Sequence, residues 1–186
     1  MSVQLTRHRF TWDDYHAMVA AGALRDDDRV ELIEGEIVDR TPIGSRHGAA
    51  VDLLNRWLVM GCGTRAIVRV QGPLRPGAHS EPQPDLLVLK PRDDFYRGKP
   101  PTADDVLLLI EVADSSLQYD QTVKLPLYAR AGVREVWLVD LVRNEVQVHR
   151  EPTPGGFGFV ECRGRGSLVE PIAFPGLSLR VDELLG

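Results

Sequence analysis

The sequence predicts an α/β protein in which helices pack on a mixed, curved β-sheet of about six or more strands. Segments with apolar residues at helical spacing alternate along the chain with short apolar or alternating runs typical of strands. A length of 186 residues and a hydrophobic content of 43% suit one domain with a substantial core. We therefore expect a single domain over residues 1–186.

The N-terminal part of the chain predicts a short helix and a hairpin. Thr11 is a suitable N-cap, acidic residues follow it in the first turn, and the helical pattern ends near Gly22. Residues 29–40 (RVELIEGEIVDR) predict two strands around a turn at Glu34 and Gly35.

The clearest amphipathic helix comes next, over residues 45–61, and Gly61 is expected to end it. Residues 66–70 alternate apolar side chains with arginines, which predicts a strand with one wet face. Residues 85–89 and 105–113 are denser in apolar side chains and predict strands covered on both faces.

The remainder of the chain predicts a loop, a helix and more strands. Residues 90–104 are rich in proline and charge, as in a loop, and residues 120–132 predict a helix. Pro126 requires that this helix either starts near Lys124 or is kinked. Three further strands and a final helical turn are expected at residues 134–140, 145–151, 157–164 and 181–185.

Charge, cysteines and hydropathy exclude several classes of protein. The formal net charge of −5 argues against indiscriminate coating of nucleic acid, which depends on neutralising phosphates. Cys62 and Cys162 lie far apart without a CxxC or histidine pair, so neither a disulfide framework nor a zinc site is indicated. Because no apolar run approaches the roughly 20 residues that cross a bilayer, we expect a cytoplasmic protein without membrane contact.

Two carboxylates stand where a charge is costly. Glu111 follows a run of five apolar residues, and Asp85 directly precedes the apolar run 86–89. Carboxylates at the ends of adjacent strands repel one another, and a hard divalent cation such as Mg²⁺ removes that repulsion. The pair therefore suggests a metal site.

A lysine follows these carboxylates on a predicted helix. Asp120, Lys124 and Tyr128 are four residues apart and share one helix face, which can look back toward the strand ends. An ammonium group there can hold the attacking water or the scissile phosphate. The alternative is a surface ion pair between Asp120 and Lys124 with little energetic consequence.

The order of these motifs resembles that of the Uma2 family of bacterial proteins, within the PD-(D/E)xK restriction-endonuclease-like superfamily. The shared order is "PD", "LLLIEVADSS", "DxxxK" and a tyrosine, followed by "AGVREVWLVD", and the likeness spans well over half of the chain. The resemblance implies a restriction-endonuclease-like core that holds Mg²⁺ or Mn²⁺ and hydrolyses phosphodiester bonds in DNA.

The same resemblance implies roles for individual residues. Asp85 and Glu111 correspond to the two acidic metal ligands, and the Val112 carbonyl to a third. The orthodox pattern has lysine two residues after the second acid, where this chain has Ala113, and the family variant with the lysine on the next helix points to Lys124.

Two further positions are implied on the N-terminal side. An acidic residue of the hairpin can complete the metal shell, with Glu34 preferred for its place at the turn and Glu31 nearly equal. His47 lies at the start of the long helix. There it either contacts a phosphate, transfers a proton near neutral pH, or is simply a polar residue at the helix end.

The leading hypothesis is a metal-dependent nuclease acting on DNA. The displaced lysine and the acidic balance favour an alternative, a catalytically inactive module of the same fold that binds nucleic acid or a partner protein. A homodimer is also expected, because exposed sheet edges can be covered by a second copy.

Overall fold

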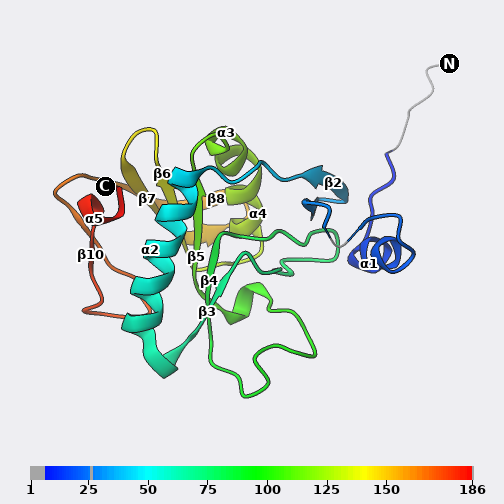
Figure 1. Cartoon of the computed structure of the whole chain (residues 1–186), viewed down its shortest axis with the longest axis horizontal. Helices are drawn as coiled ribbons and strands as arrows, with labels where there is room; N and C mark the ends of the chain where they lie inside the picture. Colours follow the sequence, from blue (N-terminus) through cyan, green and yellow to red (C-terminus); the bar gives the residue numbers. More distant parts are fainter. Residues whose placement is uncertain (1–6, 26, 186) are drawn as a thin grey trace.

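A six-stranded mixed sheet forms the centre of the molecule (Figure 1). The computed structural model describes residues 7–25 and 27–185. The strand order is β3-β4-β5-β6-β7-β8; β5 and β6 are parallel, and the other neighbouring pairs are antiparallel. The strands are β3 (Ile67–Val70), β4 (Leu86–Leu89), β5 (Val106–Ala113), β6 (Glu135–Asp140), β7 (Glu145–Thr153) and β8 (Gly156–Gly164).

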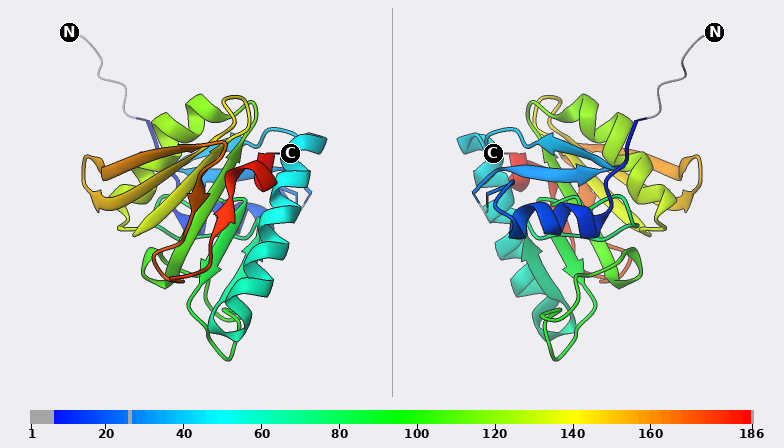
Figure 2. Two further views of the ribbon diagram at one scale, coloured as in Figure 1. Left: turned by 90° about the vertical axis from the view of Figure 1, so that its left-hand side faces the viewer. Right: turned by 90° about the vertical axis from the view of Figure 1, so that its right-hand side faces the viewer.

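Helices cover both faces of this sheet (Figure 2). The helices α2 (Ser45–Cys62) and α5 (Val181–Leu185) pack on one face against Trp137 and the even-numbered residues of β4 and β5. The helix α4 (Leu125–Arg130) packs on the other face, against odd-numbered residues of the same strands. Because successive side chains of a strand point to opposite faces, strands covered on both sides are continuous apolar runs, as the sequence indicated.

The long helix α2 does not end at Gly61 as predicted. Gly61 lies inside the helix, and a Cβ there would lie 2.3 Å from Cδ1 of Leu177. The helix ends at Gly63, whose φ of 55° is in the left-handed region that favours glycine. The first glycine therefore permits a close tertiary contact, and the second ends the helix.

The predicted helix around Pro126 starts earlier and contains a wider turn. It runs through α3 (Leu117–Tyr119), a π-helical segment η3 (Asp120–Lys124) and α4, with Pro126 near the start of α4. Proline has no N–H to donate to the carbonyl four residues earlier, and the π turn just before it accommodates this break. Of the two alternatives, a helix that starts near Lys124 is confirmed for α4, which has Pro126 in its first turn.

A hairpin and a short helix form a separate group at one end of the sheet (Figure 1). The strands β1 (Val30–Ile33) and β2 (Glu36–Asp39) form a two-stranded sheet of their own, and Leu32 of β1 also makes an isolated bridge with Glu81. Glu34 and Gly35 both have positive φ, at 51° and 85°, as a two-residue hairpin turn requires. This turn fixes which residues of the two strands share a face.

The remaining elements are short. The helix α1 (Trp12–Ala20) begins at Thr11, whose hydroxyl and backbone form a capping box with Asp14. The other pieces, not predicted from the sequence, are η1 (Gly63–Arg65), η2 (Ala103–Asp105), β9 (Leu168–Val169) and β10 (Leu179–Arg180). Within residues 7–25 and 27–185, no helix combines the length and apolar character needed to cross a bilayer.

The strands β3 and β8 are the edges of the sheet. Val160 on β8 and Val70 on β3 are exposed apolar side chains there. The homodimer expected from such edges stays a prediction.

Candidate active site

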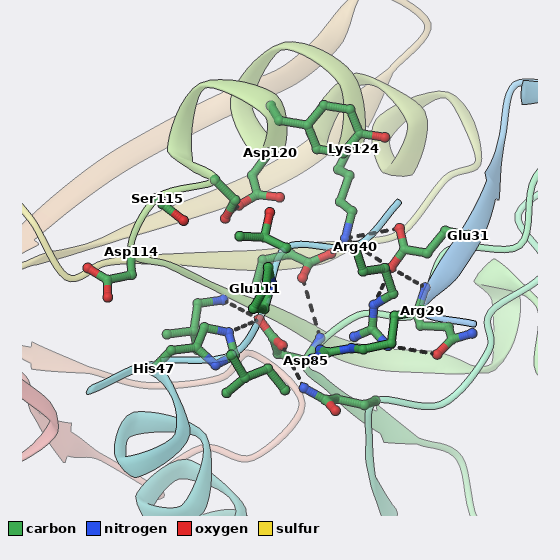
Figure 3. Close-up of a pocket in the computed structure, with 18 of the residues that line it drawn as sticks. Arg29, Glu31, Arg40, His47, Asp85, Glu111, Asp114, Ser115, Asp120 and Lys124 are labelled. Carbon is green, nitrogen blue, oxygen red and sulfur yellow. Dashed lines mark hydrogen bonds and ion pairs between the residues drawn. The ribbon is translucent and has the colours of Figure 1, made fainter. Parts of the chain in front are cut away.

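A pocket of about 250 Å³ lies where β4 and β5 meet, on the side of the sheet covered by α3, η3 and α4 (Figure 3). The β1–β2 hairpin forms one wall, and the turn after β5 with η3 forms another. The first turn of α2 closes a third side. Among the lining residues are Glu31, His47, Asp85, Glu111, Val112 and Lys124, so most of the candidates predicted from the sequence come together here.

Asp85 stands just before β4 and is held in a fixed orientation. Its Oδ2 accepts a hydrogen bond from the Val112 backbone N–H at 2.9 Å and lies 3.0 Å from Nε2 of His47. Burial alone would raise the pKa of Asp85, but the His47 and Val112 contacts lower it below its usual value. The carboxyl is therefore ionised at neutral pH.

His47, in the first turn of α2, is the partner of this carboxylate. The hydrogen bond to Asp85 raises the pKa of the imidazole above its usual value. The expected position of His47 at the start of the helix is confirmed, and its side chain is turned inward to the aspartate rather than left as a free polar end.

Glu111 lies on β5 next to Asp85, and its side chain points to the α4 face. Its Oε1 accepts a hydrogen bond from the hydroxyl of Tyr128 at 2.6 Å and lies 3.2 Å from Nζ of Lys124. Burial raises its pKa to about 8, although the Lys124 charge opposes this shift. The carboxyl is thus short of compensating positive charge.

Lys124 reaches the strand ends from η3, as the four-residue spacing predicted. Its ammonium lies 3.2 Å from Glu111 and 3.4 Å from Glu31. Burial would lower the pKa of Lys124, but the carboxylates of Glu111, Glu31 and Asp120 together raise it above its usual value. The group therefore carries its charge inside the protein.

The alternative of a surface pair between Asp120 and Lys124 is wrong. The two residues are only 4% and 8% exposed, and both line the pocket. Asp120 accepts a hydrogen bond from the Ser116 hydroxyl at 2.6 Å, and burial raises its pKa to about 6. This helix face belongs to the site.

The preference for Glu34 over Glu31 is corrected by the structure. Glu34 sits at the tip of the hairpin, is exposed, and pairs with Arg130 outside the pocket. Glu31 is 3% exposed and contacts Lys124. The turn that made Glu34 attractive carries its side chain away, because the strand rather than its tip packs against the site.

Several pocket residues escaped the sequence analysis, and two of them contact the predicted acidic residues directly. Arg40 contacts Glu31 at 3.2 Å, and Gln71 donates to Oδ1 of Asp85 at 3.4 Å. The two-residue turn would have identified Arg40, since its register places residues 29, 31, 38 and 40 on one face. No local signal marks Gln71, which adopts a φ of 47° just after β3.

The residues at the centre of the pocket fit a hard divalent cation by ligand type. Carboxylate and backbone carbonyl oxygens are the ligands that Mg²⁺ prefers, and Asp85, Glu111 and the Val112 carbonyl offer such oxygens. The N–H and C=O of one strand residue point to the same neighbour, so the Val112 carbonyl faces the side of Asp85. Among the described residues, however, no group of three or more His, Cys, Asp or Glu side chains is preassembled as a metal site.

The fold and this pocket together define a restriction-endonuclease-like α/β protein. Its acidic pair lies at adjacent strands, and a lysine reaches this pair from the following helix. The chain belongs to the Uma2 family, whose model, described as "Putative restriction endonuclease", matches residues 12–182. This confirms the resemblance seen in the sequence.

The fold is shared with a solved structure from Anabaena variabilis described as "a putative nuclease belonging to DUF820". The likeness covers 95% of this chain and 97% of that chain, with a TM-score of 0.72 and 19% sequence identity. Among curated proteins, none matches the chain.

Proposed function

We propose that the protein is a nuclease that hydrolyses phosphodiester bonds in DNA with the help of Mg²⁺ or Mn²⁺. One observation carries the proposal: Asp85, Glu111 and Lys124, from a loop end, a strand and a helix, converge on one pocket. The family and the shared fold support the same class of reaction.

The chain's own residues have distinct tasks in this proposal. Asp85, Glu111 and the Val112 carbonyl would hold the cation, which would supply positive charge to offset the negative charge that develops on the phosphate. The Lys124 ammonium donates to the attacking water or to a phosphate oxygen. It is already charged and desolvated, so little reorganisation accompanies this contact.

Two positioning residues support these groups. Glu31 forms a second ion pair with the Lys124 ammonium, in addition to the pair with Glu111. The two carboxylates together fix the position of Nζ. His47 holds one oxygen of Asp85, which orients the carboxylate toward the pocket. Groups held in this way lose little entropy when the substrate binds.

The decisive test measures cleavage of single-stranded, duplex and supercoiled DNA with Mg²⁺ or Mn²⁺. We expect the wild type to cleave and Asp85→Asn to be slower by about 10²-fold or more, since the variant keeps the shape but loses a ligand charge. Circular dichroism of both proteins checks that they are folded. Equal rates for the two proteins on every substrate would refute hydrolysis by this site.

The hairpin offers a matched pair of glutamates as a control. Glu31→Gln removes the buried partner of Lys124, whereas Glu34→Gln changes an exposed glutamate three residues away. We expect a loss of about tenfold or more for the first and less than about twofold for the second. The pair separates a role in the pocket from a general effect of charge on the hairpin.

A second candidate is a module of the same fold that binds nucleic acid without hydrolysing it. The observation that favours it is that no group of three metal-ligating side chains is preassembled in the described part of the chain. In that case DNA binding persists without Mg²⁺, and Asp85→Asn binds as the wild type does.

A further inference from the structure

We infer that the substrate of this site is single-stranded or locally unpaired DNA, which enters along a wall formed by Arg29 and Arg40. The inference rests on the proposed function and names the class of DNA that the same pocket accepts. It is carried by the depth of the pocket, the charge of its walls and one aromatic side chain.

The reactive groups lie at the bottom of a recess rather than on an open groove. Asp85, Glu111 and Lys124 are each less than 10% exposed, and the recess above them measures about 250 Å³. This lies below the roughly 300–1,000 Å³ of pockets that take drug-sized ligands, and suits little more than one phosphate and its sugar. A single backbone enters so narrow a recess more readily than a duplex does, because the second strand makes the duplex wider.

The hairpin brings both arginines and carboxylates to the pocket, since Arg29, Glu31, Asp39 and Arg40 all line it. Arg29 and Arg40 share the face of the hairpin that lines the pocket, and Figure 3 shows both on the same side as Glu31. Arg40 is held by Glu31 and by Gln83, at 3.2 and 3.0 Å. Arg29 is exposed, and its side chain has no ion pair among the described residues. One phosphate backbone can therefore follow this wall.

The wall on the other side carries two further carboxylates. Asp114 and Asp120 line it together with Ser115, and Figure 3 shows them across the pocket from the two arginines. The second backbone of a duplex centred on the pocket would approach these carboxylates and be repelled. A single strand keeps to the arginine side and avoids them.

An aromatic side chain next to Asp120 on the second wall suits an unstacked base. Tyr119 lines the pocket, and its buried hydroxyl has no hydrogen-bond partner within the described part of the chain. Aromatic rings that stack on bases, joined to a cationic track for the backbone, are how proteins bind single strands without sequence preference.

Fluorescence anisotropy with a fluorescein-labelled oligonucleotide, alone and annealed to its complement, tests the inference. Binding is measured in EDTA and in Mg²⁺, with intact DNA verified on a gel afterwards. We expect the single strand to bind about tenfold more tightly than the duplex in at least one of the two buffers. Equal or tighter duplex binding, or no binding of either DNA, would overturn the inference.

A matched pair of charge reversals locates the binding wall. Arg29→Glu should weaken binding of the single strand by about tenfold, and Arg97→Glu, an exposed arginine in the loop before η2, by less than about twofold. Neither side chain has an ion pair among residues 7–25 and 27–185, so neither change is expected to unfold the protein. An unchanged affinity for Arg29→Glu would overturn the inference.

Cleavage of the same DNAs separates this inference from the proposed function. If the single strand binds preferentially but is cut no faster than by Asp85→Asn, hydrolysis fails while the substrate class stands. If the duplex is cut as fast as the single strand, the substrate class fails while hydrolysis stands. On a duplex with an unpaired tail, we expect cuts within the tail.

Discussion

The two faces of the central sheet are built from different chemistry. On the α2 face, Leu54, Leu58 and Trp137 are completely buried within an apolar cluster. On the α4 face, the ends of β4 and β5 bury Glu111 and Lys124 beside a second apolar cluster. The first face stabilises the fold by removing apolar surface from water. The second face offsets part of this stabilisation, because it also buries charged groups.

The cost arises because buried ions lose their hydration. Even a well-made buried ion pair often stabilises a protein no more than apolar side chains of the same size. Glu111 shows this directly, since burial raises its pKa despite an ammonium 3.2 Å away. We infer that the α4 face retains its charges for chemistry and that the α2 face supplies the stability this requires. The following predictions test that division.

The largest effect should come from Lys124. Lys124→Gln keeps much of the side-chain volume but removes the charge, and we expect DNA cleavage to fall by about 10²–10³-fold, or roughly 3–4 kcal/mol. Steady-state cleavage assays on the wild type and the variant check this. A variant that remains folded and cleaves at the wild-type rate would show that the ammonium serves only structure.

The next effect concerns stability on the α2 face. Leu54→Ala should lower the free energy of unfolding by about 2–5 kcal/mol, because it leaves a cavity among completely buried side chains. Val59→Ala on the same helix, at a position 50% exposed, is the matched control and should cost about 0.5 kcal/mol or less. Urea unfolding gives both values. Similar losses for the two variants would mean that this face is not the main source of stability.

A smaller effect of opposite sign is expected at Glu111. Its pKa in the folded protein lies above the unfolded value, so its contribution to stability is present in acid and is lost as the pH rises from about 4.5 to 8. Glu111→Gln removes this loss and should raise the free energy of unfolding by about 1–3 kcal/mol at pH 8, while cleavage becomes slower.

Urea unfolding of metal-free protein at several pH values measures the Glu111 effect. Asp120, with a pKa raised to about 6, contributes a similar loss over a lower pH range in both proteins. If Glu111→Gln is less stable than the wild type at pH 8, the ion pair with Lys124 stabilises the protein, and the proposed division between the two faces is wrong.

The smallest effect lies on β7, away from the pocket. Burial lowers the pKa of His149 to about 4, so the folded protein resists protonation and stability is lost as the pH falls from about 6.5 to 4. We expect His149→Leu to reduce this acid loss by about 1–2 kcal/mol. His8→Leu, at an exposed position, is the control. Unfolding curves at pH 7 and pH 4.5 provide the comparison, and identical acid losses in all three proteins would contradict it.

The sequence predicted most elements because their signals are local. Apolar periodicity identified the long helix and the strands of the sheet, and Asp85 and Glu111 were expected at the ends of adjacent strands. The structure confirms that the two strands are adjacent, since Leu86 pairs with Ile110, although Glu111 lies within β5 rather than at its end. The helix face of Asp120, Lys124 and Tyr128 followed in the same way from the spacing.

The errors occurred where packing over long distances decides. In β1 the alternation of Val30 and Leu32 with Glu31 predicted the strand but not its surroundings, and all four of its residues are buried. Its far side packs against the pocket, and that contact was not encoded in the hairpin pattern. Gly61 was misread for the same reason, because its partner Leu177 lies over a hundred residues later in the chain.

By itself, the sequence determined which residue types stand at strand ends and on one helix face, because a period of two or of 3.6 residues sets these relations within each segment. Only the tertiary structure decided that Glu31 rather than Glu34 meets Lys124, and that Arg40 and Gln71 join them. Contacts between distant segments depend on which element packs against each face of a strand or helix, and the whole fold decides that packing. The depth of the pocket, and with it the inferred substrate, belongs to that second kind of information.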